Sequence, residues 1–255
     1  MNTENTFDAA GLLNAPPIVL IHGSVVTRKM WLPQLRGLSD AYRVIAPDLP
    51  GHGALAHIPF SFSASVETLA DLIRSEANGH ALLTGLSLGG YVAMEMASRH
   101  PELAAGLVLS GCSLNFEGLV GAYVRLVSGL MRRGWLKQSR AQAEEKTRRM
   151  FPPEMADVCE AQMQAGVYPD VLGPIFAEMA GKDYTQLLAG YPGDGLILNG
   201  ENDQSSRKNE AKFAAALTRG RLQVVPGAGH ACNIDQPKAF NRAVRGFARE
   251  IGWGR

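Results

Sequence analysis

The sequence predicts an α/β fold built around a mainly parallel sheet. Short runs of consecutive apolar residues, such as residues 17–21, are typical of strands that are buried on both faces. These runs alternate with helix-forming segments, which is the pattern of repeated strand–helix units. A chain of 255 residues, 46% hydrophobic and 19% charged, has enough apolar residues for one large α/β domain or two small ones.

We expect about six main strands. They lie at residues 17–21, 43–46, 82–86, 106–110, 196–200 and 221–225. Too few residues precede the first of them for an opening hairpin with its loops. A poor edge strand near residues 7–13 is the one addition that this stretch allows.

The expected helices lie between these strands. They cover residues 30–38, 63–77, 91–99, 206–218 and 236–251, and Ser63 or Ser65 is the expected N-cap of the second. Residues 113–190 break the alternation, because they contain many helix formers, several prolines and no β-branched run. We therefore expect a helical insertion there.

One serine lies at a sharp strand-to-helix junction. The motif Gly-x-Ser-x-Gly, residues 85–89, follows the third expected strand and precedes a run of helix formers. Such a turn exposes the hydroxyl of Ser87, and its glycines avoid collisions with the neighbouring helix or strand. It also places the N–H groups of the helix N-terminus behind the reacting oxygen. The motif predicts a nucleophile, although small residues around a serine also occur in ordinary tight turns.

A carboxylate and a histidine follow two other strands. Asp203 comes after the fifth strand and His230 after the sixth. Alone, each would be an ordinary turn residue. Together with Ser87 they should meet at one edge of the sheet, because the ends of parallel strands meet there. An imidazole can take the proton of a serine, and a carboxylate can hold that imidazole in the required tautomer.

The chain order Ser87, Asp203, His230 resembles that of the α/β-hydrolase family, and the resemblance covers nearly the whole sequence. It implies an α/β-hydrolase fold and a Ser-His-Asp catalytic triad. It also implies an oxyanion hole made by the backbone N–H of Leu88 and one from the loop after His22-Gly23, which we assign to Ser24.

Other residues near the strand ends have alternative roles. The Ser24 hydroxyl and Val25 remain open as further oxyanion contacts. Glu201 and Asp194 are candidates for the acid only if the turn after the fifth strand is shifted. We expect His22 to brace its loop and His52, in a family-like Pro-Gly-His-Gly segment, to be structural.

The insertion falls where the family carries a helical cap. The resemblance thus divides the chain into a core domain, residues 1–112 and 191–255, and a cap, residues 113–190. An apolar pocket lining is expected from some of Met131, Met150, Met155, Met163, Met179, Val120, Tyr123, Leu126 and Phe176. The basic residues Arg132, Arg133, Lys137, Arg140, Lys146, Arg148 and Arg149 are interpreted as a solvated face balanced by Glu144 and Glu145, with binding of a carboxylated or coenzyme A-linked substrate as the minority alternative.

The resemblance implies a serine hydrolase that cleaves a small carboxylic ester or lactone through an acyl-enzyme, without a metal or organic cofactor. One alternative is carbon–carbon bond hydrolysis or a lyase reaction like that of the menaquinone-pathway synthase, which uses the same triad. A hydrolase-like ligand receptor with little turnover is an alternative of a different class.

Composition and charge limit the kinds of binding partner and the cellular location that we expect for the protein. A net charge of +1 gives no electrostatic reason to expect nucleic acid or an anionic membrane. The N-terminus is polar and acidic, and no apolar run approaches the length of a membrane span. The three cysteines lack the spacing of metal or redox motifs, so we expect reduced, buried thiols. We therefore expect a cytoplasmic monomer or homodimer acting on a small molecule.

Overall fold

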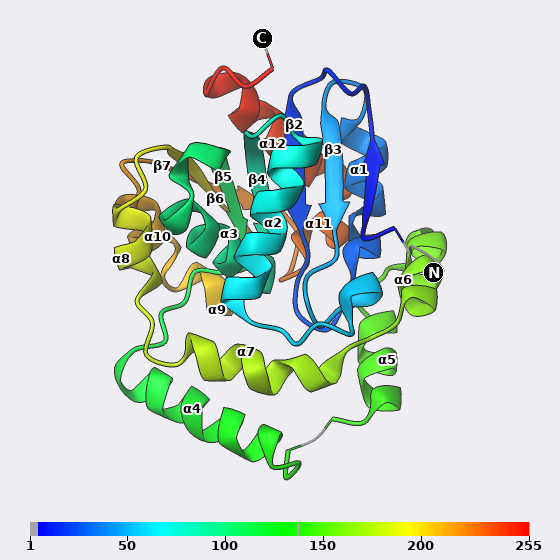
Figure 1. The fold of residues 1–255 in the computed structure, drawn as a ribbon, viewed down its shortest axis with the longest axis vertical. Coiled ribbons are helices and arrows are strands. Elements are labelled where there is room, and N and C mark those ends of the chain that lie inside the picture. Colours follow the sequence, from blue (N-terminus) through cyan, green and yellow to red (C-terminus); the bar gives the residue numbers. More distant parts are fainter. Residues whose placement is uncertain (1–4, 137, 255) are drawn as a thin grey trace.

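Seven strands form one sheet in the computed structural model, which describes residues 5–136 and 138–254 (Figure 1). They are β1 (Phe7–Ala10), β2 (Pro17–Ile21), β3 (Arg43–Pro47), β4 (Ala81–Leu86), β5 (Ala104–Ser110), β6 (Asp194–Gly200) and β7 (Arg219–Val225). Their order is β1-β3-β2-β4-β5-β6-β7, and β2 to β7 are parallel. The mainly parallel sheet that the alternating pattern predicts is thus confirmed.

The edge strand β1 lies within the expected stretch 7–13 and pairs antiparallel with β3. It is short, and ionic contacts add to its backbone pairing. The carboxylate of Asp8 lies 3.2 Å from the guanidinium of Arg28 and 2.7 Å from the ammonium of Lys29. These contacts attach the edge strand to the segment that follows β2.

Helices cover both faces of the sheet (Figure 1). The strands' side chains point alternately to the two faces, so Val19 and Ile21 belong to one core cluster and Ile18 and Leu20 to the other. The first cluster includes α2 (Phe62–Glu76), α3 (Leu88–Arg99) and α10 (Glu210–Ala216). The second includes α1 (Leu32–Leu38), α11 (Cys232–Asp235) and α12 (Pro237–Glu250).

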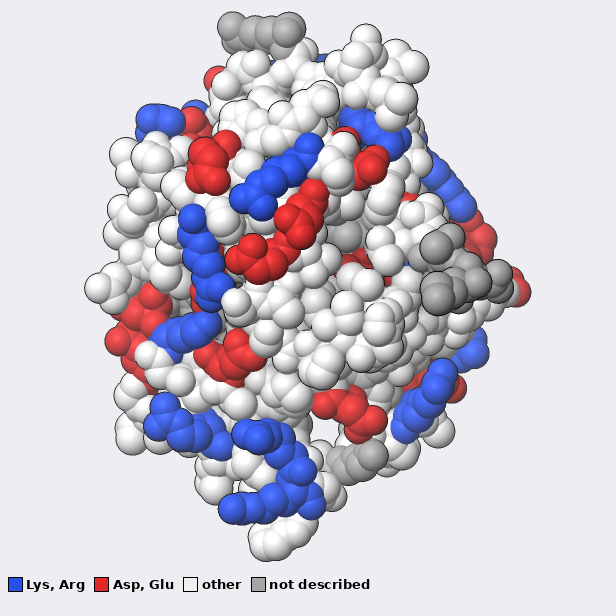
Figure 2. Space-filling model, viewed as in Figure 1, with Lys and Arg blue, Asp and Glu red and all other residues white. Residues whose placement is uncertain are grey.

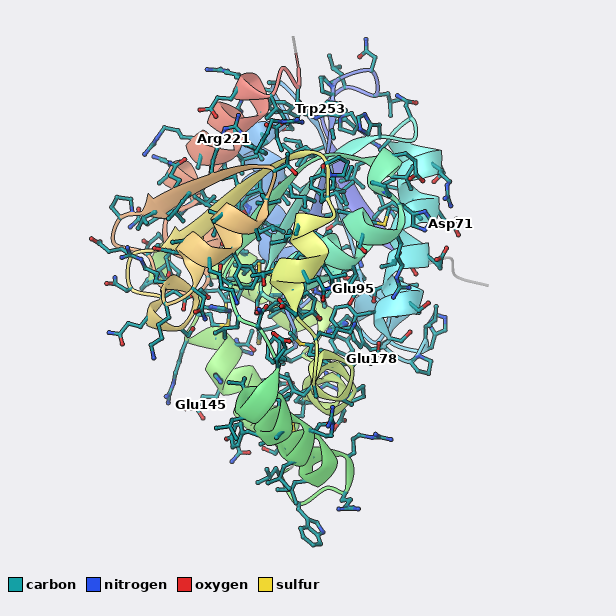
Figure 3. The ribbon with its side chains drawn as sticks, turned by 90° about the vertical axis from the view of Figure 1, so that its left-hand side faces the viewer. Asp71, Glu95, Glu145, Glu178, Arg221 and Trp253 are labelled. Carbon is teal, nitrogen blue, oxygen red and sulfur yellow. The ribbon has the colours of Figure 1, made fainter. Side chains whose placement is uncertain are left out.

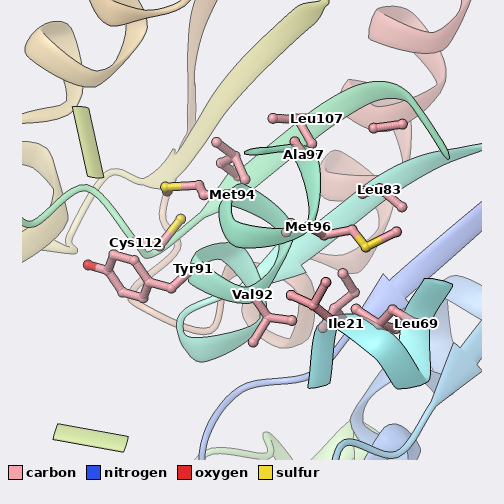
Figure 4. Close-up of a cluster of buried hydrophobic side chains, with 14 of the residues drawn as sticks. Ile21, Leu69, Leu83, Tyr91, Val92, Met94, Met96, Ala97, Leu107 and Cys112 are labelled. Atoms are coloured by element: carbon pink, nitrogen blue, oxygen red, sulfur yellow. The ribbon is translucent and has the colours of Figure 1, made fainter. Parts of the chain in front are cut away.

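The helix α3 is buried from Leu88 to Ala97. Figure 4 shows its Val92, Met94 and Met96 among side chains of the strands, including Leu83 and Leu107. Close packing on this scale leaves a helix little freedom to shift. The N-terminus of α3, and the turn that leads into it, are therefore held in place by the core.

Two helices differ from the sequence-based expectation. The N-cap of α2 is Ser61, whose side chain accepts a hydrogen bond from the N–H of Ala64, so the expected caps Ser63 and Ser65 are wrong. The expected helix 206–218 is two helices, α9 (Gln204–Arg207) and α10, separated by Lys208 and Asn209. The Asp203 side chain caps α9 by accepting from the N–H of Ser206, which starts that helix early.

The insertion consists of short helices between β5 and β6. They are α4 (Gly118–Arg132), α5 (Arg140–Arg148), α6 (Ala156–Ala165), α7 (Leu172–Met179) and α8 (Tyr184–Ala189). In Figure 1, α4, α5 and α7 lie beyond the end of the sheet, whereas α8 lies beside it. Tyr184 and Leu188 of α8 belong to a core cluster of the sheet. Shorter 3-10 turns are Arg28–Trp31, Gly53–Leu55, Pro101–Leu103, Pro153–Met155 and Pro169–Val171.

Polar contacts attach the insertion to the helices of the core. The carboxylate of Glu178 on α7 accepts a hydrogen bond of 3.0 Å from the backbone N–H of Phe62, at the start of α2. Lys182, after α7, forms an ion pair with Glu95 of α3. Figure 3 shows Glu95 and Glu178 between the core and the insertion. Two polar contacts therefore attach the C-terminal end of α7 to the core helices α2 and α3.

The helix lengths and the states of the cysteines bear on the expectations from composition. No helix in the described ranges combines the length and the hydrophobicity that crossing a bilayer requires. Cys112, Cys159 and Cys232 are free thiols, and of these Cys112 and Cys232 are buried.

Candidate active site

Ser87 lies in the sharp turn between β4 and α3. Its backbone has φ 54° and ψ −117°, a conformation that is costly for a residue with a side chain. The backbone N–H of Ser87 donates a 2.7 Å hydrogen bond to the carbonyl of Ser110 on the neighbouring strand. The strained turn is thus held by the sheet on one side and by the buried helix α3 on the other.

The two glycines of the motif are required by close backbone approaches. A Cβ atom on Gly89 would lie 2.0 Å from the carbonyl oxygen of Ile21, and one on Gly85 would lie 2.3 Å from the carbonyl oxygen of Gly89. Both contacts are with backbone, which cannot move aside as a flexible side chain can. Side chains are therefore excluded at Gly85 and Gly89, as the motif predicts.

His230 and Asp203 are hydrogen-bonded, with 2.8 Å between Nδ1 and Oδ2. The side chain of His230 is 48% exposed, whereas that of Asp203 is 4% exposed. Asp203 also accepts hydrogen bonds from the Ser205 hydroxyl at 2.7 Å and from the N–H of Ser206 at 3.2 Å. Burial by itself would raise the pKa of Asp203, but the bonds from His230, Ser205 and Ser206 outweigh it and hold the pKa below its ordinary value.

This pairing assigns the imidazole tautomer. An ionised carboxylate accepts hydrogen bonds and donates none, so Nδ1 of His230 carries the proton that points at Asp203. In the neutral imidazole, Nε2 then keeps its lone pair and can accept a proton.

The other carboxylates considered for this position have different partners. Glu201 accepts a 2.8 Å hydrogen bond from the backbone N–H of Gly227. Asp194 forms ion pairs with Arg219 and Arg221 at the far end of β6. Of the three candidates, Asp203 is the one that contacts His230.

Ser87 and His230 line the same cavity, which has a volume of about 430 Å³. No hydrogen bond between the Ser87 hydroxyl and His230 occurs in the described part of the chain. Gly111 accounts for the position of the imidazole, because a Cβ atom at this residue would lie 2.9 Å from Cε1 of His230. The structure thus joins the acid to the base directly, and brings the serine into the same cavity as the base.

The expected oxyanion donors flank the same turn. Leu88 is the first residue of α3, so its N–H has no partner within the helix. On the other side, a Cβ atom on Gly23 would lie 3.7 Å from Cβ of Ser87, and Ser24 lines the cavity. Val25 has a φ of 72°, an unusual value for a β-branched residue. Two residues that line the cavity, Ser87 and Val25, therefore have strained backbone.

The loop that holds Ser24 and Val25 is attached to the insertion. The side-chain oxygen of Gln162 on α6 accepts hydrogen bonds of 3.1 Å from both the N–H and the hydroxyl of Thr27. The N–H of Tyr168 donates a 2.8 Å bond to the carbonyl of Val25. Sequence reasoning missed Gln162 and Tyr168, because nothing in their local sequence marks contacts with residues so distant in the chain.

His22 and His52 have structural positions, as expected. Nδ1 of His22 donates to the carbonyl of Gly23 at 2.8 Å, and its Nε2 accepts from the N–H of Leu49 at 3.0 Å. His52 contacts His22 edge to face and donates from Nδ1 to the carbonyl of Pro50. Burial lowers the pKa of His22 to about 4 and that of His52 to about 3, so both are neutral near pH 7.

The cavity lining is mostly apolar and comes from both parts of the chain. The insertion contributes Met131, Met150, Leu172 and Phe176, and the core contributes Val25, Val26, Met30 and Leu86. Of the residues that the sequence offered for a pocket, Met155 and Met179 are buried in the two core clusters. Met163 is absent from the lining.

Three residues that were expected to line the pocket lie on the outer face of α4, so this part of the prediction is wrong. Val120, Tyr123 and Leu126 are absent from the cavity lining, and they are 51%, 67% and 62% exposed. Periodicity alone cannot distinguish the inner from the outer face of a helix that packs on one side only. Figure 2 shows Lys and Arg side chains at the lower end of the molecule, where Figure 1 places α4.

The expected basic face is partly correct. Arg140 pairs with Glu144 and Arg149 pairs with Glu145 on the surface of α5. Lys146 on the same helix lines the cavity instead. Lys137 lies outside the described residues. Within those residues, no group of three or more His, Cys, Asp or Glu side chains could hold a metal ion.

Comparison with known proteins agrees with this architecture. A thermophilic esterase from Thermogutta terrifontis has a similar structure, with a TM-score of 0.80, 27% sequence identity and coverage of 96% of this chain and 93% of that one. The 2-(acetamidomethylene)succinate hydrolase of Mesorhizobium japonicum is 26% identical over 253 residues, 92% of this chain and 88% of that protein.

A third relative matches more strongly over a shorter region. The pimeloyl-[acyl-carrier protein] methyl ester esterase of Aromatoleum aromaticum is 37% identical over 101 residues, 40% of this chain. This chain spans 39% of the length of that esterase and 36% of a 37% identical hydrolase-superfamily protein from Gibberella zeae. The sequence model of the alpha/beta hydrolase family matches residues 18–243. The chain therefore belongs to the α/β-hydrolase family.

Proposed function

We propose that this protein is a serine hydrolase that cleaves a small carboxylic ester or lactone through an acyl-enzyme. The observation that carries the proposal is the arrangement around the cavity. Ser87 occupies a strained turn that lines the cavity, and His230, hydrogen-bonded at 2.8 Å to buried Asp203, lines the same cavity. This arrangement supplies a nucleophile, a base and a group that orients the base.

In the first half of the reaction, Oγ of Ser87 attacks the carbonyl carbon of the ester. Its proton moves to Nε2 of His230, and the carbonyl electrons move to oxygen. The N–H groups of Leu88 and Ser24 donate hydrogen bonds to this oxyanion. His230 then returns the proton to the departing alkoxide, so that an alcohol leaves and the acyl group stays on Ser87. With a lactone, the alcohol remains attached to the acyl group.

In the second half, water attacks the acyl-enzyme. His230 takes a proton from the water, and collapse of the second tetrahedral intermediate breaks the bond to Oγ of Ser87. The proton returns to Oγ, and a carboxylic acid is released. Asp203 stabilises the imidazolium in both halves, since its pKa stays below the ordinary range and it remains ionised.

We further propose that residues 113–190 act as a cap on a core made of residues 1–112 and 191–255. Met131, Met150 and Phe176 of this segment face the Ser87 cavity from the side opposite the sheet. An apolar cover of this kind would exclude water from part of the substrate and strengthen the polar interactions at the carbonyl. The acyl or alcohol group would lie between cap and core.

Relatives favour ester hydrolysis over the alternatives. Two of the proteins described above are esterases by name, whereas the third, a hydrolase of 2-(acetamidomethylene)succinate, supports hydrolysis but not an ester substrate. Similarity to an enol-lactonase from Burkholderia xenovorans and to MenH from S. aureus, at 22% and 19% identity, concerns the fold alone. A carbon–carbon hydrolase or lyase and a ligand receptor therefore remain as outcomes of the test.

The test combines covalent labelling with a substrate panel. We expect wild-type protein to hydrolyse p-nitrophenyl acetate with a burst of nitrophenol and to react with a fluorophosphonate at Ser87, as located by mass spectrometry. Ser87→Ala, with an unchanged circular dichroism spectrum, should lose both activities. Absence of labelling and of turnover in folded wild-type protein would favour a receptor. Cleavage of a dienone without ester cleavage would favour carbon–carbon chemistry.

A further inference from the structure

Lys146 is the one permanently charged side chain that lines the Ser87 cavity among the described residues. The rest of the lining beside Ser87 and His230 is apolar or neutral. Toward the insertion, it includes Met131, Gln138, Ala143, Thr147, Met150, Leu172 and Phe176. A cation and the proposed nucleophile therefore line the same, mostly apolar cavity.

Lys146 has no carboxylate within ion-pair distance among the described residues, unlike two basic neighbours on its own helix. Arg140 pairs with Glu144 at 3.0 Å, and Arg149 pairs with Glu145. Both glutamates are thus engaged four residues from their partners, which is the usual pairing distance on a helix surface. The ammonium of Lys146 is left for solvent or for a ligand.

The cavity holds no opposing charge. None of its described lining residues is an aspartate or glutamate. Asp203 lies behind His230 and is bonded to it, to Ser205 and to Ser206. A ligand carboxylate at the mouth would therefore be attracted by Lys146 without repulsion from the lining. A ligand ammonium there would be repelled.

The exposure of Lys146 suits a group that binds at the mouth. Lys146 is exposed, so its ammonium stays hydrated. Its methylene chain can lie along the apolar lining. An ion pair formed there keeps part of its hydration and avoids the large desolvation cost of a buried pair. It favours an anionic ligand modestly and is sensitive to salt.

We propose that Lys146 makes the protein selective for esters that carry a carboxylate at the end remote from the scissile bond, such as monoesters of dicarboxylic acids. This inference rests on the proposed hydrolase function. The scissile carbonyl would lie at Ser87, the intervening chain would contact Met131, Met150 and Phe176, and the remote carboxylate would pair with the ammonium of Lys146.

The test compares charged and neutral substrates of matched length. The substrates are monomethyl and dimethyl esters of straight-chain dicarboxylic acids from glutarate to suberate, with acetyl esters of ω-hydroxy acids for a carboxylate on the alcohol side. We expect Lys146→Met to lower the ratio of kcat/KM for the charged over the neutral ester about fivefold, mainly through KM. Lys146→Glu should lower it further, and added salt should reduce the wild-type ratio.

Arg148→Met is the matched control, because it removes the same charge from the exposed surface of α5 without touching the cavity lining. It should leave the ratio within about twofold of wild type. An unchanged ratio in Lys146→Met with both substrate series, or an equal fall in Arg148→Met, would overturn the inference.

Measurements of ligand binding without turnover test this inference separately from the proposed function. Calorimetry with Ser87→Ala and with Ser87→Ala/Lys146→Met measures affinity for a monoester without turnover. Tighter binding by the protein that keeps Lys146 supports the inference even where wild-type protein hydrolyses no ester. Hydrolysis of neutral esters with no effect of Lys146 on binding would support the function and reject the inference.

Discussion

The edge of the sheet where the strands end has two regions that contain similar residues in different states. Beyond β2 and β3, the side chains of His22, His52 and Asp48 are fully buried. Beyond β4 and β7, Ser87 and His230 line an open cavity, and His230 is 48% exposed. Histidines at the ends of parallel strands thus differ in burial and in hydrogen-bond partners. The closed region maintains the loops, and the open region has side chains that can reach a substrate.

The largest expected effect concerns the open region. Ser87→Ala and His230→Ala should each lower ester kcat/KM by about 10⁴-fold or more, because each removes a group that takes part in bond making or proton transfer. Thermal unfolding should change little, since both side chains lie above the sheet. Steady-state kinetics and calorimetry check this. Activity within a few-fold of wild type in either variant would remove the proposed roles.

Asp203 tests whether the orienting group matters as much as the base. Asp203→Asn should lower kcat by about 10³- to 10⁴-fold, because an amide no longer selects the tautomer with Nδ1 protonated or stabilises the imidazolium. Glu201→Gln is the matched control, since Glu201 bonds to Gly227 and not to His230. Equal losses in the two variants would indicate a general disturbance of the loops after β6 and β7.

The closed region should control stability in acid. The pKa of His22 is lowered to about 4 and that of His52 to about 3. The unfolded chain therefore binds more protons than the folded one from about pH 6.5 down to these values, so stability falls as pH falls. Each histidine contributes a slope of up to about 1.4 kcal/mol per pH unit in this window.

Urea unfolding at about pH 7 and pH 5 measures this loss. His52→Asn removes one of the two buried imidazoles and should reduce the acid-induced loss relative to wild type. An identical loss in both proteins would mean that His52 is charged or exposed in solution. If the variant does not fold, the slope of the wild-type protein still tests the combined effect.

The smallest expected effect concerns the contact between the insertion and the loop that follows β2. Gln162→Ala removes both hydrogen bonds to Thr27 and should destabilise the protein by about 1–2 kcal/mol. Because Thr27 follows the loop that holds Ser24, kcat should fall by only about two- to tenfold. Gln164→Ala on the exposed side of α6 is the control. A loss of kcat as large as that of Asp203→Asn would place Gln162 in a different role.

Much of this arrangement could be predicted because it depends on local sequence. Apolar runs indicated the parallel strands, and Gly85 and Gly89 marked the turn at Ser87 through contacts that exclude any side chain. The order of Ser87, Asp203 and His230 indicated the family, and the hydrogen bond between His230 and Asp203 agrees with the predicted pairing. Local features of this kind are visible in the sequence because each depends on a few neighbouring residues.

The insertion was harder to predict, because helical periodicity identifies an apolar face without its partner. Tyr123 and Leu126 have the spacing of pocket residues but lie on the outer face of α4. Lys146 belongs to a basic run that suggests a solvated surface, yet it lines the cavity. Gln162 carries no local signal, since its partner Thr27 is more than a hundred residues away in the chain.

The sequence by itself determined the sheet, the turn that exposes Ser87 and the identity of the residues at the strand ends, because short-range sterics and the burial of strands are encoded in adjacent residues. Only the tertiary structure decided which histidines are buried, which carboxylate meets His230 and which insertion residues face the cavity. Those outcomes depend on the packing of distant segments, and burial, hydrogen-bond partners and charge environment exist only after that packing has formed.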